Sequence, residues 1–232
     1  MRKRLEVIAT TPEDAMIAEQ AGADRIELIA AQQEGGLTPS LGIIEYITET
    51  VHIPVNVMVR PHSRHFRYDH AELNSMIRDI RHISRTGATA IVTGVLTEDR
   101  QIDTNALERL LDAADGKPFT FHRAFDELDD LERGLDMLSR YPQITHILTS
   151  GGQPSVLQAV DQMIALNRLA IQYPIQLIAG AGLTLQSLAD FVTHTSIQEV
   201  HLGSAVRIHS DINLALDPVR IAQAQQLLQA SI

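Results

Sequence analysis

The sequence of 232 residues contains no cysteine and no tryptophan, and aromatic residues make up only 4% of it. The absence of cysteine excludes disulfide bonds, thiol catalysis and metal sites built on thiolates. A run of about 18 apolar residues, which a membrane-spanning helix needs, is also absent. The basic start Met1–Arg4 is followed by a short apolar stretch that Glu6 interrupts. We interpret this start as the approach to a first strand and not as a signal peptide.

The composition is typical of a globular protein, with 44% hydrophobic and 21% charged residues. The length fits one large domain with a sizeable core, so we expect a single domain over residues 1–232. The net charge of -10 disfavours bulk binding to nucleic acid or to an anionic membrane, although a local basic patch can still bind phosphate.

Short strand-like runs alternate with helical patterns along the chain, which predicts an α/β fold. Eight such runs at regular spacing indicate a (β/α)8 TIM barrel. A doubly wound open sheet is the alternative, since it also alternates strands and helices. The expected strands are Leu5–Ala9, Arg25–Ile29, Val55–Val59, Ala90–Thr93, Phe119–His122, His146–Thr149, Gln176–Ala179 and Glu199–Leu202.

Helix boundaries are marked by residues that favour helix ends. Thr11 followed by Pro12 predicts the start of a helix, and Gly22 predicts its end. Thr184 is expected to cap the seventh helix, and Pro154 is expected to open the sixth.

Polar side chains occur in several expected strands near the end that faces the active side of such barrels. The segment Phe121–Asp126 places a histidine and an arginine after a buried run. Side chains alternate along a strand, so we expect one shared inner layer. Its members are Glu6, Glu27, Arg60, His122 and His201. Buried charges have to pair or bind something, so this layer is either a functional site or an ion-pair network that only caps the barrel.

The residue types in this layer suit acid–base chemistry on an anion. Histidine acts as acid, base or metal ligand near neutral pH, and a glutamate can orient it or accept a proton itself. The candidate catalytic residues are therefore Glu6, Glu27, His122 and His201. Arg60 and Arg123 offer forked donors for a carboxylate or phosphate. Asp126 is either a ligand or the cap of the fifth helix.

Glycine-containing loops follow the last two expected strands. Gly180 and Gly182 follow the seventh strand, and Gly203 and Ser204 follow the eighth. Loops at these places of a TIM barrel often bind phosphate through backbone N–H groups, although the glycines alternatively only turn the chain. The segment 149–152 after the sixth strand is expected to add further donors.

The segment Pro61–Tyr68 is basic and aromatic in an otherwise acidic chain. It is either a lid over an anionic ligand or a solvated surface loop. The remaining histidines show no ligand spacing, and we expect them at the surface or in packing. They include His52, His70, His82, His146, His194 and His209.

In these motifs the chain resembles the CutC family, known as copper homeostasis proteins. The resemblance covers nearly the whole chain and implies a TIM barrel, a cytoplasmic location and a homodimer. The segments that carry it are Gly22–Leu28, Glu34–Ser40, Arg60–Pro61, Phe121–Asp126, Leu148–Gly152 and His201 with Gly203–Ala205.

The chain departs from the family at the positions that matter for copper. Members commonly carry cysteines, the favoured Cu(I) ligands, where this chain has Ile8 and Ile29. Isoleucine ligates no metal, so Cu(I) binding through thiolates is excluded. Met58 is a candidate thioether ligand, although a lone strand methionine is usually part of the core. The segment His62–His65 replaces an Arg-Gly-Gly-Asp-like run, and Val206 stands where an arginine is usual, although Arg207 follows.

Two functions remain open at this level. One is an enzyme that acts on a small anionic metabolite, phosphorylated or carboxylated, by acid–base chemistry. The other is a metal-binding homeostasis protein that uses His122, His201 and carboxylates. That donor set favours a borderline or hard divalent ion over Cu(I), and the sequence does not identify a cofactor.

Overall fold

The computed structural model describes residues 2–231, and within them eight parallel strands pair in sequence order into a closed barrel. The last strand pairs with the first, so the open-sheet alternative is wrong and the (β/α)8 TIM barrel is confirmed. The strands are β1 Arg4–Ala9, β2 Arg25–Leu28, β3 Val55–Met58, β4 Ala90–Thr93, β5 Phe119–Phe121, β6 Ile144–Thr149, β7 Gln176–Ala179 and β8 Glu199–Leu202.

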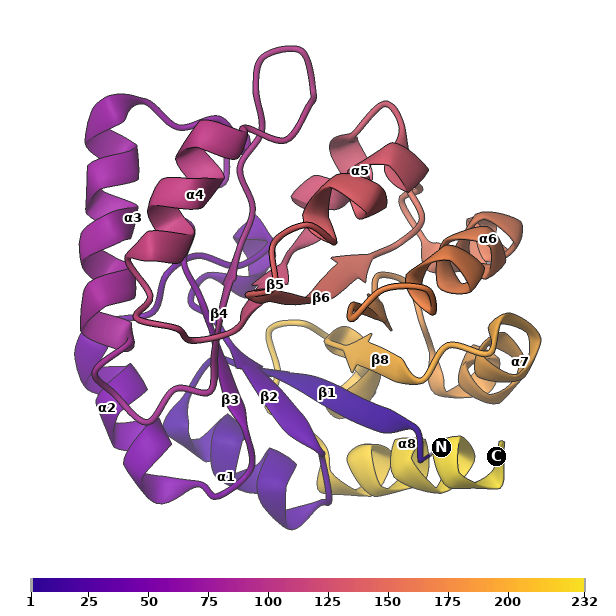
Figure 1. The fold of residues 1–232 in the computed structure, drawn as a ribbon. Coiled ribbons are helices and arrows are strands. Elements are labelled where there is room, and N and C mark those ends of the chain that lie inside the picture. The colour runs from indigo at the N-terminus through magenta and orange to yellow at the C-terminus, as the bar shows by residue number, and fades with distance from the viewer. Residues whose placement is uncertain (1, 232) are drawn as a thin grey trace.

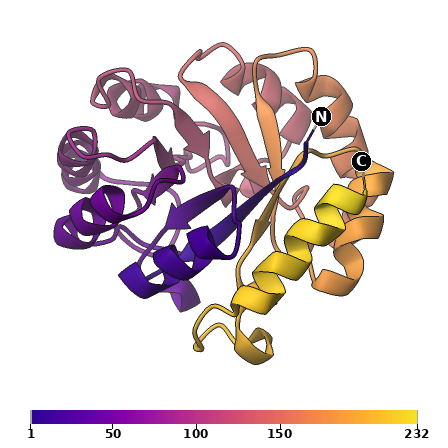
Figure 2. The same ribbon diagram turned by 90° about the horizontal axis from the view of Figure 1, so that it is seen from below.

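Figures 1 and 2 show the α-helices arranged around the outside of the strands. They are α1 Pro12–Gln20, α2 Leu41–Thr50, α3 His70–Ile83, α4 Thr104–Asp112, α5 Leu131–Leu138, α6 Val160–Ala170, α7 Leu185–Thr195 and α8 Pro218–Ala230. In both views the start of β1 lies beside the end of α8. The Lys3 ammonium donates to the carbonyl oxygen of Ser231 across this junction at 2.7 Å.

Three of the four residues expected at helix ends, Thr11, Gly22 and Thr184, lie at the start or end of a helix as predicted. The Thr11 hydroxyl accepts from the Asp14 N–H at the start of α1, and Gly22 follows the end of that helix with φ +91°. Thr184 forms a reciprocal cap with Ser187 at α7. The prediction that Pro154 opens the sixth helix is wrong. A separate 3₁₀ turn, Val156–Gln158, comes first, and the non-helical backbone at Ala159 separates it from α6.

The strands match the expected runs, with shifts at their ends. Three are one residue shorter than expected at the carboxyl end, because Ile29, Val59 and His122 lie outside β2, β3 and β5. Two begin earlier than expected, with β1 at Arg4 and β6 at Ile144. His122 instead caps a 3₁₀ helix, Arg123–Glu127, with its own ring nitrogen, and this local hydrogen bond ends the strand.

The two faces of the barrel wall differ in chemistry. Leu5, Val7 and Ala9 of β1 belong to the large apolar core between the strands and helices. By alternation the positions between them face the barrel interior, which holds Glu6. The interior also has a small apolar cluster of Ile29, Met58 and Val92, against which Ile8 packs. Between residues 2 and 231, no helix is both long and apolar enough to cross a membrane.

Candidate functional site

A cavity of about 610 Å³ lies at the carboxyl ends of the strands. Most of the residues singled out in the sequence lie in its wall: Glu27, Arg60, His122, Arg123, Gly182, His201, Gly203 and Ser204. Glu6 and Gly180 do not line it. The polar layer expected from the sequence therefore lies partly in the cavity wall and partly below it.

Glu6 belongs to a buried ion-pair network deeper in the barrel. Its carboxylate accepts from the Arg25 Nε–H at 2.5 Å and from the Asn56 amide at 3.3 Å. Arg25 also pairs with Glu199 at 2.9 Å, and His146 lies 3.4 Å from the same Glu199 carboxylate. The alternative of an ion-pair network is thus correct for this lower layer.

Arg25 and His146 were missed as members of the barrel interior. Arg25 lies two residues before Glu27 in the same strand, so alternation alone places both on the inner face. His146 is half-buried and close to Glu199, so it is not a simple packing or surface residue. The signal for it is its position two residues before the inward-facing Leu148.

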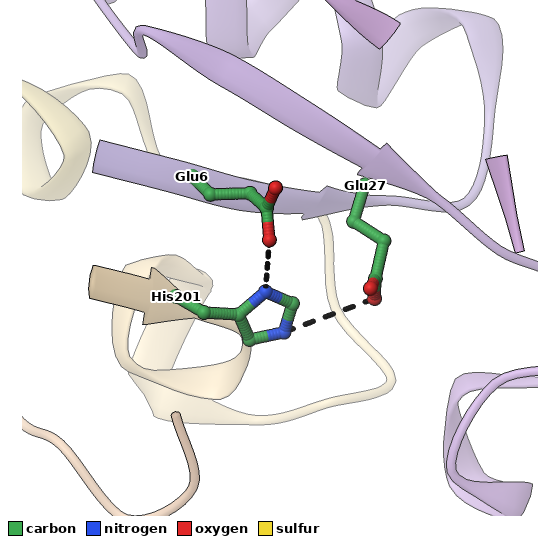
Figure 3. Close-up of side chains that lie close together, drawn as sticks. All are labelled: Glu6, Glu27 and His201. Atoms are coloured by element: carbon green, nitrogen blue, oxygen red, sulfur yellow. Dashed lines mark hydrogen bonds and ion pairs between the residues drawn. The ribbon is translucent and has the colours of Figure 1, made fainter. Parts of the chain in front are cut away.

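His201 lies between two glutamates, as Figure 3 shows. Its Nδ1 is 2.7 Å from Glu6 Oε1, and its Nε2 is 3.9 Å from Glu27 Oε2. Burial opposes protonation of His201, but the charge of Glu27 and the hydrogen bond with Glu6 outweigh burial and raise its pKa. Burial likewise opposes ionisation of Glu6, but the charge of Arg25 and the bond with His201 hold its pKa well below the usual range.

Glu27 is a buried carboxyl group with one oxygen that has no hydrogen-bond partner. It is 3% exposed, and its Oε1 has no hydrogen-bond partner. Burial raises the pKa of Glu27 to about 7, and the nearby charge of His201 reduces this rise without cancelling it. A carboxyl group with a pKa near neutrality can both accept and return a proton at physiological pH.

His122 is a neutral donor in the same cavity. Its Nδ1 accepts from the Ala124 N–H at 3.2 Å, so the single proton of the neutral ring lies on Nε2. That Nε2 is buried and has no partner. Burial and the charge of Arg60 lower the pKa of His122 to about 3, so the ring stays neutral and offers an N–H donor.

Arg60 holds the rim loops together. Its guanidinium donates to the carbonyl oxygens of Glu34, Gly36 and Ser63 at 3.2–3.3 Å. It also stacks on Phe66, with 4.6 Å between Cζ and the ring centre. Only the buried Nε lacks a partner. Most of the donor capacity expected for an anion is therefore occupied by backbone carbonyls.

Arg123 is more accessible, with 42% of its side chain exposed. It donates to Asp126 at 2.8 Å and to the Ser150 hydroxyl at 3.1 Å. Asp126 also accepts from the N–H groups of Ser150 and Gly152 and from the hydroxyl of Thr149. The expectation that Asp126 caps the fifth helix is wrong, because the cap of α5 is Asp130 and Asp126 anchors the loop after β6. Asp126 also lines the cavity, and its role as a ligand stays a prediction. The donors expected from residues 149–152 are largely taken up by this anchor.

The glycines after β7 and β8 permit close packing. A Cβ at Gly180 would come within 2.7 Å of Leu148 Cδ1, and one at Gly182 would overlap the Ser155 hydroxyl. Gly203 lies against Ile8, whose Cδ1 would be 2.9 Å from an added Cβ. The structural role of these glycines is therefore clear, and an anion-binding role stays a prediction.

The segment Pro61–Tyr68 lies partly buried on the rim. Phe66 packs on His122, with ring centres 4.7 Å apart, and lines the cavity. His62 packs edge-on against His65 and lies 5.3 Å from the Tyr68 ring. This packing is tighter than expected of a solvated loop. Five other histidines are exposed, namely His52, His70, His82, His194 and His209.

The family model described as the CutC family matches residues 3–206. A CutC family protein from Pasteurella multocida is 39% identical over 207 residues, which covers 86% of this chain and 81% of the relative. One from Salmonella enteritidis is 36% identical over 206 residues, which covers 89% and 82% of the two chains.

Solved structures agree with the barrel. A CutC protein from Streptococcus agalactiae superposes with a TM-score of 0.81 at 31% identity, covering 86% of this chain and 97% of that one. A phosphoribosyl anthranilate isomerase from Thermococcus kodakaraensis gives a TM-score of 0.62 at 18% identity, with 98% and 99% covered. At that identity the second likeness concerns the fold alone.

Proposed function

This chain belongs to the CutC family, and from its barrel-mouth cavity we propose that it is an enzyme that moves a proton on a small carbonyl compound. One observation carries the proposal. Glu27 Oε1 and His122 Nε2 are buried polar atoms without partners, and both residues line the same cavity. Because an unpaired buried polar group is costly, such atoms favour a ligand that completes them.

The chemistry follows from the protonation state of each group. Glu27, as carboxylate, accepts a proton from the carbon next to the carbonyl group. The electron pair of the broken C–H bond forms a C=C bond, and the carbonyl oxygen gains negative charge. The neutral His122 Nε2–H donates a hydrogen bond to that oxygen. Return of a proton from Glu27 to the same carbon, after Glu27 has exchanged it with solvent, completes a hydrogen exchange. Where that carbon carries a hydroxyl group, Glu27 instead returns the proton to the former carbonyl carbon, and the hydroxyl proton moves to the former carbonyl oxygen as the new C=O bond forms, which completes an isomerisation.

An accessible cationic group at the cavity favours an anionic substrate. Arg123 presents a guanidinium at the rim that is 42% exposed. It pairs with Asp126, and its exposed N–H groups would attract a carboxylate or phosphate on the substrate. We therefore propose a small keto acid or a phosphorylated carbonyl compound as the substrate class.

The residues present do not fit Cu(I). The solved S. agalactiae relative is named for copper homeostasis, but a chain without cysteine offers no thiolate. The thioether of Met58 is 3% exposed and packs with Ile29 and Val92. One methionine in an apolar cluster is not a soft-metal site.

Proton exchange with solvent tests the proposal. A panel of keto acids and phosphorylated ketones is incubated with the protein in D₂O, and loss of the proton signal next to the carbonyl is followed by NMR. We expect exchange with at least one compound, its abolition by Glu27→Gln, and a reduction of about 10²–10³-fold in His122→Phe. Glu127→Gln is the matched control, since Glu127 lines the same cavity but is exposed. Absence of exchange across the panel, or full exchange in Glu27→Gln, would refute the proposal.

A divalent metal site is the second candidate, and one observation favours it. Glu6, Glu27 and His201 each offer a ligand atom, and these atoms lie within 4.8 Å of one another. The 3.9 Å between His201 Nε2 and Glu27 Oε2 is too long for a hydrogen bond and shorter than the sum of two metal–ligand bonds of about 2.0–2.2 Å, so one ion could contact both atoms at a wide ligand–metal–ligand angle. In that arrangement Glu6 would orient His201 through Nδ1 and would not itself bind the ion. His122, expected among the ligands, is not part of this group.

Metal analysis separates the two candidates. Protein purified without a histidine tag is analysed for bound metals by mass spectrometry. About one divalent ion per chain, lost in His201→Asn and retained in His122→Asn, would favour the metal site. Metal well below stoichiometry after incubation with Zn²⁺ and Mn²⁺ would exclude it.

A further inference from the structure

We propose that the ligand of this cavity is amphipathic, with an aliphatic or aromatic body that packs against the Ile8 side of the barrel interior. The orientation of that ligand rests on the proposed function, in which its carbonyl head meets Glu27 and His122. The apolar body itself is inferred from the wall of the cavity and does not depend on the reaction.

The first observation is an apolar patch in the same barrel interior that holds the buried charged residues. The interior apolar patch consists of Ile8, Ile29, Met58 and Val92, and it is separate from the main core. Ile29, Met58 and Val92 are buried, but Ile8 is half-buried. Three of the four residues line the cavity. Ile8 therefore presents apolar surface to the cavity, with the others packed behind it.

The second observation is that glycines keep this patch uncovered by neighbouring side chains. A Cβ at Gly203 would come within 2.9 Å of Ile8 Cδ1. A Cβ at Gly36 would come within 3.3 Å of Ile29 and 3.4 Å of the Met58 methyl group. A larger residue at either position would press on the patch, so its neighbours here are glycines that add no side chain over it.

The third observation is the size of the cavity. Its 610 Å³ falls in the range of about 300–1,000 Å³ that holds drug-sized ligands. A carbonyl group and one anion next to Glu27 and His122 do not need this room. Burying an apolar group against Ile8 removes apolar surface from water, which favours binding by about fourfold for each added methylene.

The chemistry of the ligand follows from these three points. It has a polar head with a carbonyl group, an anionic substituent that Arg123 attracts, and an apolar chain or ring. Specificity among such compounds would then depend on Ile8 more than on the polar residues. This makes Ile8 a specificity-determining residue.

Binding of straight-chain α-keto acids, from pyruvate to α-ketooctanoate, tests the inference by calorimetry. We expect the affinity of the wild-type protein to rise by about fourfold per methylene until the patch is covered. Ile8→Val and Ile8→Thr form a matched pair, because valine and threonine have nearly the same shape and differ in one methyl group that is a hydroxyl group in threonine. Ile8→Val should keep the rise, whereas Ile8→Thr should bind the longest acid about fivefold or more weakly than Ile8→Val.

The outcomes separate this inference from the proposed function. An affinity that does not change with chain length in the wild type overturns the inference, even where proton exchange is observed. Equal affinities of Ile8→Val and Ile8→Thr for the longest acid overturn it as well. A rise with chain length without proton exchange supports the inference and refutes the proposed reaction. Absence of binding by the whole series overturns the inference, whereas exchange with phosphorylated ketones would still support the reaction.

Discussion

Replacement of Glu27 by glutamine should stabilise the protein at alkaline pH while it abolishes proton exchange. Most buried substitutions destabilise a protein, so a gain in stability at this position would be unusual. The reason is that Glu27 is 3% exposed and has to become charged in a site that disfavours charge. Such a trade between stability and activity is typical of functional residues.

The magnitude follows from the raised pKa. Burial raises the pKa of Glu27 from 4.5 in the unfolded chain to about 7 in the folded one. The folded state then binds the proton more tightly than the unfolded state, so stability falls as the pH rises from 4.5 to about 7 and levels off above that. At 1.36 kcal/mol per pH unit the total is about 3 kcal/mol. Glutamine cannot ionise and does not incur this cost.

Chemical denaturation of both proteins at about pH 5 and about pH 9 checks this prediction. At the acidic pH wild-type Glu27 is protonated, so the two free energies of unfolding should differ little. At the alkaline pH the Glu27→Gln protein should be more stable by about 1–3 kcal/mol. In a thermal scan this corresponds to a midpoint higher by roughly 2–12 °C for a protein of this size. Glu127→Gln should show no such pH-dependent gain, since Glu127 is exposed. A Glu27→Gln protein that is equally or less stable at both pH values would refute the raised pKa and with it the assigned proton acceptor.

Three further predictions concern the surrounding network. Arg25→Leu leaves Glu6 and Glu199 buried without their shared partner and should cost about 3–5 kcal/mol in urea unfolding. Arg4→Leu removes the ion pair of the mostly exposed Arg4 with Glu199, which keeps Arg25 as a partner, and should cost under about 1 kcal/mol. Equal losses would contradict the network. The His122 ring should show no protonation in NMR spectra between about pH 5 and pH 8, because its pKa is lowered to about 3, and a midpoint inside that range would disprove the neutral donor. Below about pH 6.5 the unfolded chain binds a proton at His122 more readily than the folded protein does, so the free energy of unfolding should fall as the pH falls. Asp126→Asn should weaken the hydrogen bonds that anchor the loop after β6 and lower the free energy of unfolding by about 1–3 kcal/mol. It should also speed amide hydrogen exchange at residues 149–152. Unchanged exchange there would show that the anchor is dispensable.

Alternation along strands explains why the sequence locates much of the candidate site. Glu27 and His201 lie at inward positions of short strands flanked by apolar residues, and both line the cavity. Arg25, two residues before Glu27 in β2, lies on the same inward face by the same alternation. Alternation identifies which face of a strand a residue occupies, but it does not give the depth of that residue in the barrel. The sequence therefore did not show that Glu6 lies below the cavity, where it pairs with Arg25.

Hydrogen bonds between loops that are distant in the sequence could not be predicted. Asp126 binds the loop after β6, whose residues are 23–26 positions away in the chain. Arg60 donates to carbonyl oxygens in two separate loops. Neither pairing follows from spacing, because each depends on how loops of irregular backbone fold over the barrel.

The sequence by itself determined the barrel, since strand period, helix signals and eight regular units leave few other ways to bury the apolar faces. It also determined the chemistry that is excluded, because a chain without cysteine has no thiolate. Only the tertiary structure decided which polar atoms are satisfied. Glu6 is paired by Arg25 and His201, whereas Glu27 Oε1 and His122 Nε2 have no partner. Whether a polar atom has a partner depends on distances between strands and loops that are remote in sequence. These distances separate the charged residues that stabilise the barrel from the polar groups that are available for function.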